Sequence, residues 1–220
     1  MKPPKSVQVS AFLSNPNRVI TDHDVWKLID DEDTWIFDKL IVARRSGHVC
    51  GPRGCEIPES GMYCIRPVTN FEGHSLGARF EYRKKGDTMM DIHPGEFWVK
   101  KFQGTHVSVD YINGKQALTV AGYRKLDDEL YRFRYWTKEN HYLPLPSFLK
   151  DFIPKYPVIN CEFIGRNLVE IHLRQNPDFL WGNSRMIPVW DIEQLEKIPD
   201  GFRYIPDNPP EEKRLGILID

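Results

Sequence analysis

The spacing of apolar and polar residues divides the chain into a partly helical start and a β-rich remainder. Apolar residues alternate with polar ones over residues 6–13, which predicts a short strand. Thr21 followed by Asp24 resembles a capping box and predicts a helix that continues through residues 25–29. A second short helix or turn is expected before Asp38.

Short runs rich in β-branched and aromatic residues follow and predict a mostly antiparallel sheet. Asn113-Gly114 lies between two of them and is a strong hairpin signal, because a type I′ turn needs positive φ at both central positions. A short helix is expected at residues 147–152, after a proline-rich segment. The predicted strands are residues 63–68, 76–83, 97–102, 105–112, 116–124 and 130–136.

Two later segments, residues 158–164 and 168–174, also alternate and are joined by Gly165-Arg166-Asn167, which predicts a hairpin. One face of this hairpin is then apolar and points into the core. A three-residue loop pairs Ile164 with Leu168, Glu162 with Glu170 and Asn160 with His172, and leaves Ile159, Cys161, Phe163, Val169, Ile171 and Leu173 on the apolar face.

The polar face of this hairpin carries candidate chemistry. Two carboxylates directly opposite each other, Glu162 and Glu170, destabilise a hairpin unless a cation lies between them. Oxygen ligands from both, with Asn160 or His172 beside them and phosphate oxygens completing the shell, suit Mg²⁺. The alternative is an exposed polar face on which Glu170 pairs with Arg174 or Arg166.

A second cluster follows the strand that carries Arg66. Residues 69–78 contain small residues and two glycines, Gly73 and Gly77, whose backbone N–H groups suit a phosphate chain. The alternative is that both glycines only form turns. Neither alternative is decided by this segment alone.

Composition narrows the possible functions. The 220 residues are 40% hydrophobic, enough to bury a core, and the formal net charge of −1 comes from 30 basic and 31 acidic residues that are interleaved. This balance argues against a general nucleic-acid binder. No window approaches the roughly 20 apolar residues that cross a bilayer, so we expect a soluble protein without membrane contact. The four cysteines indicate free thiols and a cytoplasmic location.

Taken in order, Asp38-Lys39-Leu40 and residues 63–78, 96–110 and 160–176 resemble the ATP-grasp family of carboxylate–amine ligases, over about two thirds of the chain. The resemblance implies an α+β fold of two lobes, each with a mainly antiparallel sheet and flanking helices, and a nucleotide site between them. It divides the chain into an N-terminal segment, 1–37, a first lobe, 38–97, and a second lobe with a C-terminal extension, 98–220.

The resemblance also implies roles for individual residues. Lys39 and Arg66 would hold the nucleotide phosphates, although the family usually has lysine where Arg66 stands. His172 stands where the family usually has asparagine among the metal ligands. The remaining implied roles are the phosphate loop with Gly73, His74 and Ser75, the adenine contacts Lys100, Lys101 and Phe102, the metal ligands Glu162 and Glu170, and the acceptor-binding arginines Arg124 and Arg174.

The implied activity is an ATP- and Mg²⁺-dependent ligase that activates a small-molecule or peptide carboxylate as an acyl phosphate for capture by an amine. The short first segment leads us to expect that a partner subunit or a second copy completes the acceptor site. Two alternatives stay open. Lys39 and Arg44 have the spacing of covalent nucleotidyltransferases such as polynucleotide ligases, without the usual Asp-Gly between them, and the protein could instead bind nucleotide without turnover.

Overall fold

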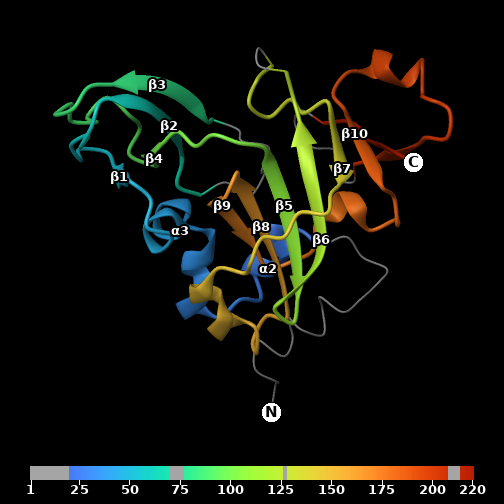
Figure 1. Cartoon of the computed structure of the whole chain (residues 1–220), viewed down its shortest axis with the longest axis horizontal. Helices are drawn as coiled ribbons and strands as arrows, with labels where there is room; N and C mark the ends of the chain where they lie inside the picture. The colour runs from blue at the N-terminus through green and yellow to red at the C-terminus, as the bar shows by residue number, and fades with distance from the viewer. Residues whose placement is uncertain (1–19, 70–76, 126–127, 208–213) are drawn as a thin grey trace.

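Two antiparallel sheets form the framework of the protein. The computed structural model describes residues 20–69, 77–125, 128–207 and 214–220 (Figure 1). The first sheet has the order β1-β4-β2-β3 and the second has the order β11-β12-β10-β7-β6-β5-β8-β9. All of the strand pairs that the structure describes are antiparallel. The prediction of an α+β fold with two mainly antiparallel sheets is therefore confirmed.

The first sheet is formed by the earlier strands and the second by the later ones. The first contains β1 (Cys50–Pro52), β2 (Gly61–Pro67), β3 (Arg79–Arg83) and β4 (Glu96–Lys100). The second contains β5 (His106–Ile112), β6 (Lys115–Tyr123), β7 (Tyr135–Lys138), β8 (Val158–Ile164), β9 (Asn167–His172), β10 (Arg185–Val189), β11 (Arg203–Pro206) and β12 (Gly216–Ile219). Strand β4 runs through the predicted boundary between residues 97 and 98, and the division into three parts stays a prediction.

Short helices connect and cover the sheets. They are α2 (Asp22–Trp26), α3 (Lys39–Arg45) and the 3₁₀ helices η1 (Asp31–Phe37), η2 (Ser147–Phe152), η3 (Pro177–Phe179) and η4 (Ile192–Leu195). The predicted capping box is confirmed, because Thr21 Oγ1 accepts from Asp24 N at 3.1 Å and Asp24 Oδ2 accepts from Thr21 N at 3.2 Å. Helix α2 nevertheless ends at Trp26, before the predicted end.

Helix α3 was not predicted, and it ties the two sheets together. Asp38 caps it by accepting from Ile41 N at 2.8 Å, and the helix packs against both β1 and β9. Its buried Val42 joins the main core, which lies between the helices and one face of the second sheet and includes Val109, Ile159 and Ile171. The opposite face of β8 and β9 is thereby left for polar side chains.

The β8–β9 hairpin differs from the predicted one by a single bulge. Glu162 pairs with Glu170 and Asn160 with His172, as predicted, but the register shifts after Glu162. Phe163 then pairs with Leu168 and Ile164 with Asn167, so the predicted pair of Ile164 with Leu168 is wrong and the turn has two residues. Because the bulge reverses the faces, the buried core residue is Leu168, and Val169 is only partly buried on the other side.

The structure confirms one predicted hairpin and shortens one predicted strand. Positive φ angles of 49° at Asn113 and 75° at Gly114 confirm the β5–β6 hairpin. The predicted strand at 130–136 is shorter, because Arg132 N bonds to Glu129 O in a turn and β7 begins only at Tyr135. The strand expected at 6–13 lies outside the described residues.

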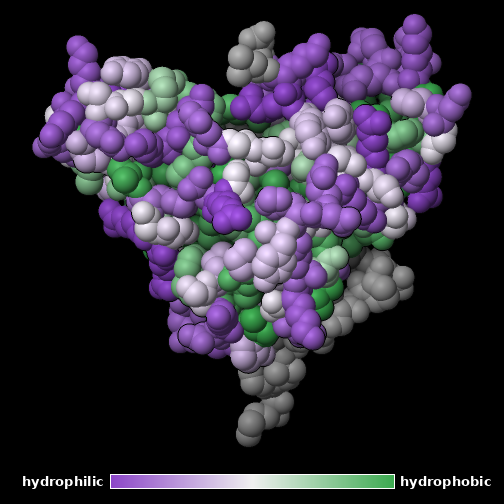
Figure 2. All heavy atoms as spheres, in the orientation of Figure 1, coloured by the Kyte–Doolittle hydropathy of each residue, from purple (hydrophilic) through white to green (hydrophobic). Residues whose placement is uncertain are grey.

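Hydrophobic residues gather toward the middle of the face shown in Figure 2, and hydrophilic residues cover its margins. All four cysteines are free, as predicted. Among the described residues, no helix has the length and apolar character needed to cross a bilayer.

Candidate functional site

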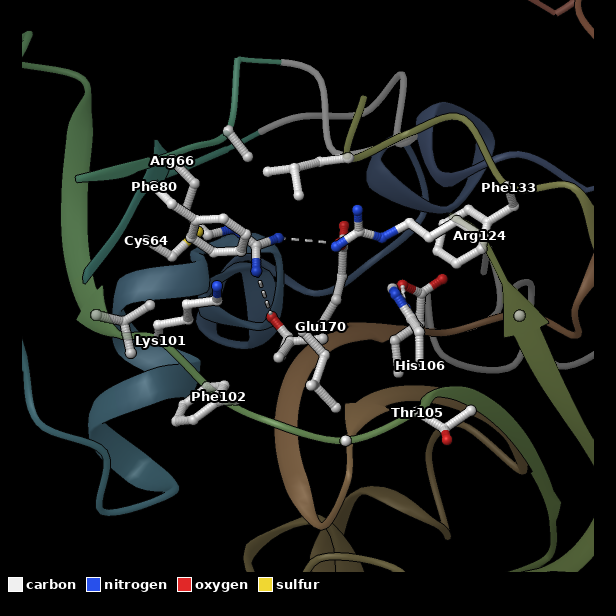
Figure 3. A pocket seen from close by; sticks show the side chains of 18 of the residues that line it. Cys64, Arg66, Phe80, Lys101, Phe102, Thr105, His106, Arg124, Phe133 and Glu170 are labelled. Atoms are coloured by element: carbon white, nitrogen blue, oxygen red, sulfur yellow. Dashed lines mark hydrogen bonds and ion pairs between the residues drawn. The ribbon is translucent and has the colours of Figure 1, made fainter. Parts of the chain in front are cut away.

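A pocket of about 520 Å³ lies between the two sheets. The first sheet contributes Arg66 from β2 and Phe80 from β3, and the second contributes His106 from β5 and the two glutamates from β8 and β9. Figure 3 shows Arg66 and Arg124 extending into this space from opposite sides. The pocket therefore has basic groups on both walls and carboxylates on its floor.

Glu170 forms ion pairs with two basic residues from the first half of the chain. Lys39 Nζ lies 2.8 Å from Oε1, and Arg66 Nη2 lies 3.2 Å from Oε2 while Nη1 donates to Val169 O at 3.3 Å. Burial raises the pKa of Glu170, but Lys39, His172 and Arg66 outweigh it and hold the pKa below its usual range. Lys39 is only 5% exposed, and burial lowers the pKa of its ammonium group against the attraction of Glu170.

Glu162 has a different partner. His106 Nε2 lies 2.9 Å from its Oε2. Burial raises the pKa of Glu162, but the hydrogen bond with His106 and the attraction of His172 and Lys39 outweigh burial, and the carboxyl pKa lies well below its usual range. Both facing carboxylates are therefore ionised at neutral pH.

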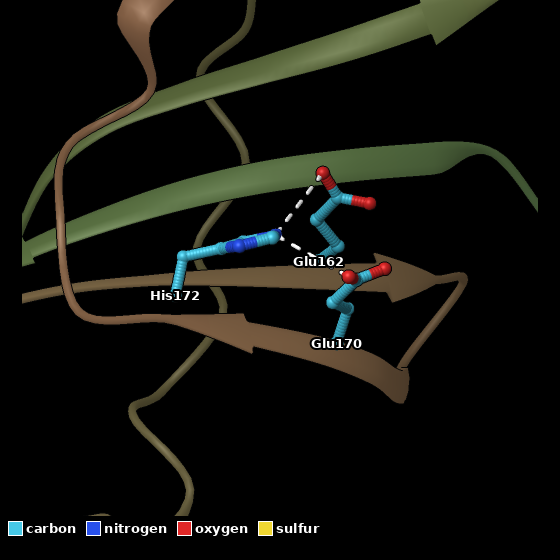
Figure 4. A group of neighbouring side chains, drawn as sticks. All are labelled: Glu162, Glu170 and His172. Carbon is cyan, nitrogen blue, oxygen red and sulfur yellow. Dashed lines mark ion pairs between the residues drawn. The ribbon is translucent and has the colours of Figure 1, made fainter. Parts of the chain in front are cut away.

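His172 lies beside both carboxylates and is held in place by Asp22. Its Nε2 lies 3.9 Å from Oε1 of Glu162 and 3.9 Å from Oε1 of Glu170 (Figure 4), and Nδ1 lies 2.8 Å from Oδ2 of Asp22. Burial lowers the pKa of His172, but Asp22 outweighs it and raises the pKa above its usual value. Arg174 donates to both oxygens of Asp22, at 3.0 and 2.9 Å, which fixes that carboxylate in place.

The donor set fits a divalent cation. One ligand atom from each of Glu162, Glu170 and His172 lies within 4.8 Å of the others. Two ionised carboxylates and an imidazole nitrogen are ordinary ligands of such ions. Among the described residues, Glu170 forms ion pairs with Lys39, Arg66 and His172, so the alternative in which Glu170 pairs with Arg174 or Arg166 is wrong.

Only some of the predicted nucleotide-binding residues line the pocket. Lys101 and Phe102 line the pocket, where Lys101 Nζ lies 4.4 Å from the centre of the Phe80 ring. Lys100 instead pairs with Glu59 and is not among the described lining residues, so the structure does not bring it to the site. Lys39 lies behind Glu170 and is likewise absent from the described lining. Gly73, His74 and Ser75 lie outside the described residues.

The two predicted acceptor arginines are also separated. Arg124 lines the pocket and donates Nη1 to Asp128 O at 3.4 Å. Arg174 is bound to Asp22 and to Gln175 O, and the described pocket lining does not include it. Of the two, only Arg124 is placed to meet a ligand in the pocket.

Sequence reasoning missed two residues of the site, His106 and Asp22. The local sequence indicated only secondary structure at these positions: His106 lies in an alternating strand, and Asp22 opens the capped helix α2. Their partners are 56 and 150 residues away, and nothing local indicates those pairings.

No family model matches the chain, and no curated protein matches it. Solved structures do match. They include a putative ATP-grasp superfamily protein from Archaeoglobus fulgidus, at 13% identity and a TM-score of 0.44, with 85% of this chain and 64% of that one covered.

Two further solved structures are enzymes. D-alanine–D-alanine ligase from Bacillus anthracis matches at 14% identity and a TM-score of 0.37, with 66% of this chain and 59% of that one covered. Carboxyaminoimidazole ribonucleotide synthase from Aspergillus clavatus, complexed with ATP, matches at 11% identity and a TM-score of 0.49, covering 90% and 72%. The chain thus spans 64% and 59% of the first two structures. These neighbours are ATP-grasp proteins, the family that the sequence motifs resemble.

Proposed function

We propose that the protein is an ATP- and Mg²⁺-dependent ligase of the ATP-grasp type, which activates a carboxylate as an acyl phosphate and passes it to an amine. The observation that supports this proposal is the facing pair Glu162 and Glu170 on the floor of a pocket between two sheets, with Arg66 bound to one of them. Paired carboxylates beside a guanidinium group are suited to a metal–phosphate ligand.

The walls of the pocket suggest how a nucleotide lies in it. Phe102, Val99 and Ile164 offer apolar surface for a base, and Lys101 is beside them. Arg66 and Arg124 supply guanidinium groups for phosphate oxygens or an acceptor carboxylate, both of which they bind bidentately. The volume lies in the usual range for small-molecule sites, about 300–1,000 Å³.

Glu162 and Glu170 would hold the divalent ion, with His172 beside them. A bound ion of this kind neutralises charge on the β- and γ-phosphate oxygens. His106 keeps Glu162 ionised and oriented. Lys39 and Arg66 do the same for Glu170, and Arg66, which lines the pocket, is near enough to turn to phosphate oxygens instead.

The reaction needs no nucleophile from the protein. An oxygen of the acceptor carboxylate forms a bond to the γ-phosphorus as the bond to the bridging oxygen of ADP breaks. The amine nitrogen then bonds to the acyl carbon, phosphate leaves, and the amine loses a proton. Positioning and charge stabilisation by Arg66 and Arg124 are the contributions of the chain.

Ligand-induced stabilisation tests the site. We expect Mg²⁺–ATP at about 100 times its dissociation constant to stabilise the wild type by about 2.7 kcal/mol, seen as a higher melting temperature. Glu170→Gln should lose this shift, because a neutral amide holds Mg²⁺ poorly. Glu193→Gln makes the same change at an exposed position and should keep it. Equal shifts in Glu170→Gln and the wild type would contradict the proposed site.

Product analysis tests the reaction. Incubation with ATP and pools of carboxylates and amines should release ADP and phosphate. Release of AMP with a stable adduct on Lys39 would instead identify a covalent nucleotidyltransferase, which the burial of Lys39 and its 2.8 Å pair with Glu170 disfavour. Nucleotide binding without any release would identify a non-catalytic binding protein.

A further inference from the structure

His172 presents one ring nitrogen to two carboxylates without bonding to either. Its side chain is 7% exposed, and its Nε2 lies 3.9 Å from an oxygen of each of Glu162 and Glu170. These distances exceed the length of a hydrogen bond. Each distance is close to the span of two bonds of about 2 Å, the length of a bond between a divalent transition metal and such ligands.

A small cavity adjoins the side chain of His172. Its volume is about 10 Å³, close to the room needed for one water-sized occupant. Its lining includes Asp22, Lys39, Glu170 and His172 together with the apolar Ile36 and Ile171. Charged groups of Asp22, Lys39 and Glu170 therefore border a space of atomic size next to His172, together with apolar side chains.

The other ring nitrogen is fixed by Asp22. Nδ1 lies 2.8 Å from Oδ2 of Asp22, and Arg174 holds both oxygens of that carboxylate. When Nδ1–H donates to Asp22, the lone pair of Nε2 is directed at the two glutamates. A histidine whose second nitrogen donates to a carboxylate is the usual arrangement behind a metal-bound imidazole.

We propose that His172 Nε2, positioned by Asp22, is a nitrogen ligand that makes the Glu162–Glu170 site prefer a divalent transition metal such as Mn²⁺ over Mg²⁺. The proposal rests on the proposed function only for the two carboxylate ligands. Imidazole is a softer ligand than an amide or water oxygen, and it raises affinity along the first transition series while adding little for Mg²⁺. Asp22 is a positioning residue in this arrangement.

The competing occupant of this position is a proton. A proton on Nε2 would give an imidazolium ion that attracts both carboxylates through the same space. Lys39 also competes, because its ammonium group already lies 2.8 Å from Glu170. If a proton on His172 or the Lys39 ammonium group occupies this position, the relative affinity for Mn²⁺ and Mg²⁺ should not depend on His172.

Binding of Mn²⁺ to the metal-stripped full chain, without nucleotide, tests the proposal. Loss of the free Mn²⁺ electron paramagnetic resonance signal gives the affinity, and electron spin echo modulation reports ¹⁴N bound to the ion. We expect His172→Asn to lower Mn²⁺ affinity at least tenfold, to change Mg²⁺ affinity less than threefold, and to abolish the ¹⁴N modulation. His141→Asn, the same change at an exposed histidine, should behave as the wild type.

Asp22→Asn tests the positioning role. We expect it to lower Mn²⁺ affinity about tenfold while the ¹⁴N modulation is retained. Wild-type affinity in Asp22→Asn would overturn that role. Circular dichroism establishes that each variant is folded, and if His172→Asn does not fold, the ¹⁴N modulation of the wild type decides alone.

Three results would overturn the inference: no Mn²⁺ binding, bound Mn²⁺ without ¹⁴N modulation, or equal Mn²⁺ affinity in His172→Asn and the wild type. Its failure differs from failure of the proposed function. Stabilisation by Mg²⁺–ATP without ¹⁴N modulation leaves the ligase proposal standing. Mn²⁺ bound through ¹⁴N without any nucleotide effect leaves only the metal site.

Discussion

Glu170 is the residue at which the two halves of the molecule meet. It lies on β9 of the second sheet, yet its carboxylate is shared by Lys39 at the start of α3 and Arg66 on β2. All three side chains are at most 13% exposed. Removing one charge from such a group leaves the others buried without a counter-charge. The resulting loss of folding free energy exceeds what the complete group contributes to stability.

This arrangement predicts non-additive stability changes. Glu170→Gln should lower the free energy of unfolding by about 3 kcal/mol, because Lys39 then lacks its counter-charge. The double variant Glu170→Gln/Lys39→Met should recover much of that loss, since the buried ammonium group is removed together with the carboxylate and only Arg66 keeps its charge. Urea unfolding at pH 7 measures both, and a double variant as unstable as the sum of the single ones would contradict the coupling.

Cys161 provides a second test at the scale of one residue. It is fully buried in the core, and burial raises the pKa of its thiol well above the usual value. The other three cysteines are partly exposed. We expect a disulfide reagent at pH 8 to leave Cys161 unmodified in the folded protein and to reach it only in denaturant. Mass spectrometry of the labelled peptides locates the modified thiols, and rapid labelling of Cys161 would show that the core opens.

At the scale of elements, the β8–β9 turn lies against the start of β5. Gly165 has a φ of 62°, and a Cβ there would lie 2.7 Å from Gln103 O, beside Gly104. This close approach of two backbones brings the hairpin, and with it both glutamates, to the edge of the pocket. Only glycine satisfies both the positive φ and the contact.

Gly165→Ala should therefore lower the free energy of unfolding by about 2–3 kcal/mol, from strain and backbone displacement together. Gly182 supplies the control, because its φ is 79° but nothing lies within 4 Å of a Cβ. Gly182→Ala should cost only about 1 kcal/mol. Chemical denaturation of both variants measures the difference, and equal losses would show that the contact with Gln103 is unimportant.

The first sheet contains an ion pair that spans one strand. Arg79 on β3 reaches Glu96 on β4 across β2, with Nη2 3.2 Å from Oε2. The Arg79 guanidinium holds the pKa of Glu96 below its usual range, although partial burial opposes it. The stability from this lowered pKa is present above the unfolded pKa of about 4.3 and is lost as pH falls through the folded pKa.

Glu96→Gln should accordingly lower the free energy of unfolding by about 0.5–1 kcal/mol at pH 7, since Arg79 is 42% exposed and the pair is partly screened. The wild type should lose stability faster than Glu96→Gln between pH 5 and pH 2.5. Urea unfolding across that range compares the slopes. Parallel slopes would mean that Arg79 does not stabilise the ionised form of Glu96.

At the scale of the whole molecule, the pocket belongs to both sheets, while β10, β11 and β12 lie at the far edge of the second sheet (Figure 1). Only α3 among the described helices packs extensively against strands of both sheets. A ligand in the pocket adds a second connection between them. Its effect on backbone opening should therefore extend to both.

Hydrogen exchange measures that effect. Mg²⁺–ATP should slow amide exchange in β2 and β4 as well as in β8 and β9, and leave β11 and β12 nearly unchanged. Glu170→Gln, with the same nucleotide, should show little protection in either sheet. Protection confined to one sheet would contradict a site built between them.

Much of the fold was predictable because its causes are local. The capping box of α2 and the Asn113-Gly114 hairpin each depend on residues close in sequence, where turn chemistry and side-chain period act directly. Helix α3 was missed because its apolar run lacks a clear helical period, and its contacts with two sheets stabilise it.

The sequence by itself determined that Glu162 and Glu170 belong to the two strands of one hairpin, because the alternating segments and the glycine turn between them are local. Their direct pairing also needs the bulge, since a two-residue turn alone would place Glu162 opposite Val169. Only the tertiary structure decided what surrounds the two glutamates. Lys39, His106 and Asp22 reach the site across long stretches of chain, and a bulge after Glu162 sets which neighbours turn inward. Such contacts follow from how sheets and helices pack, and packing is not encoded in the spacing of nearby residues.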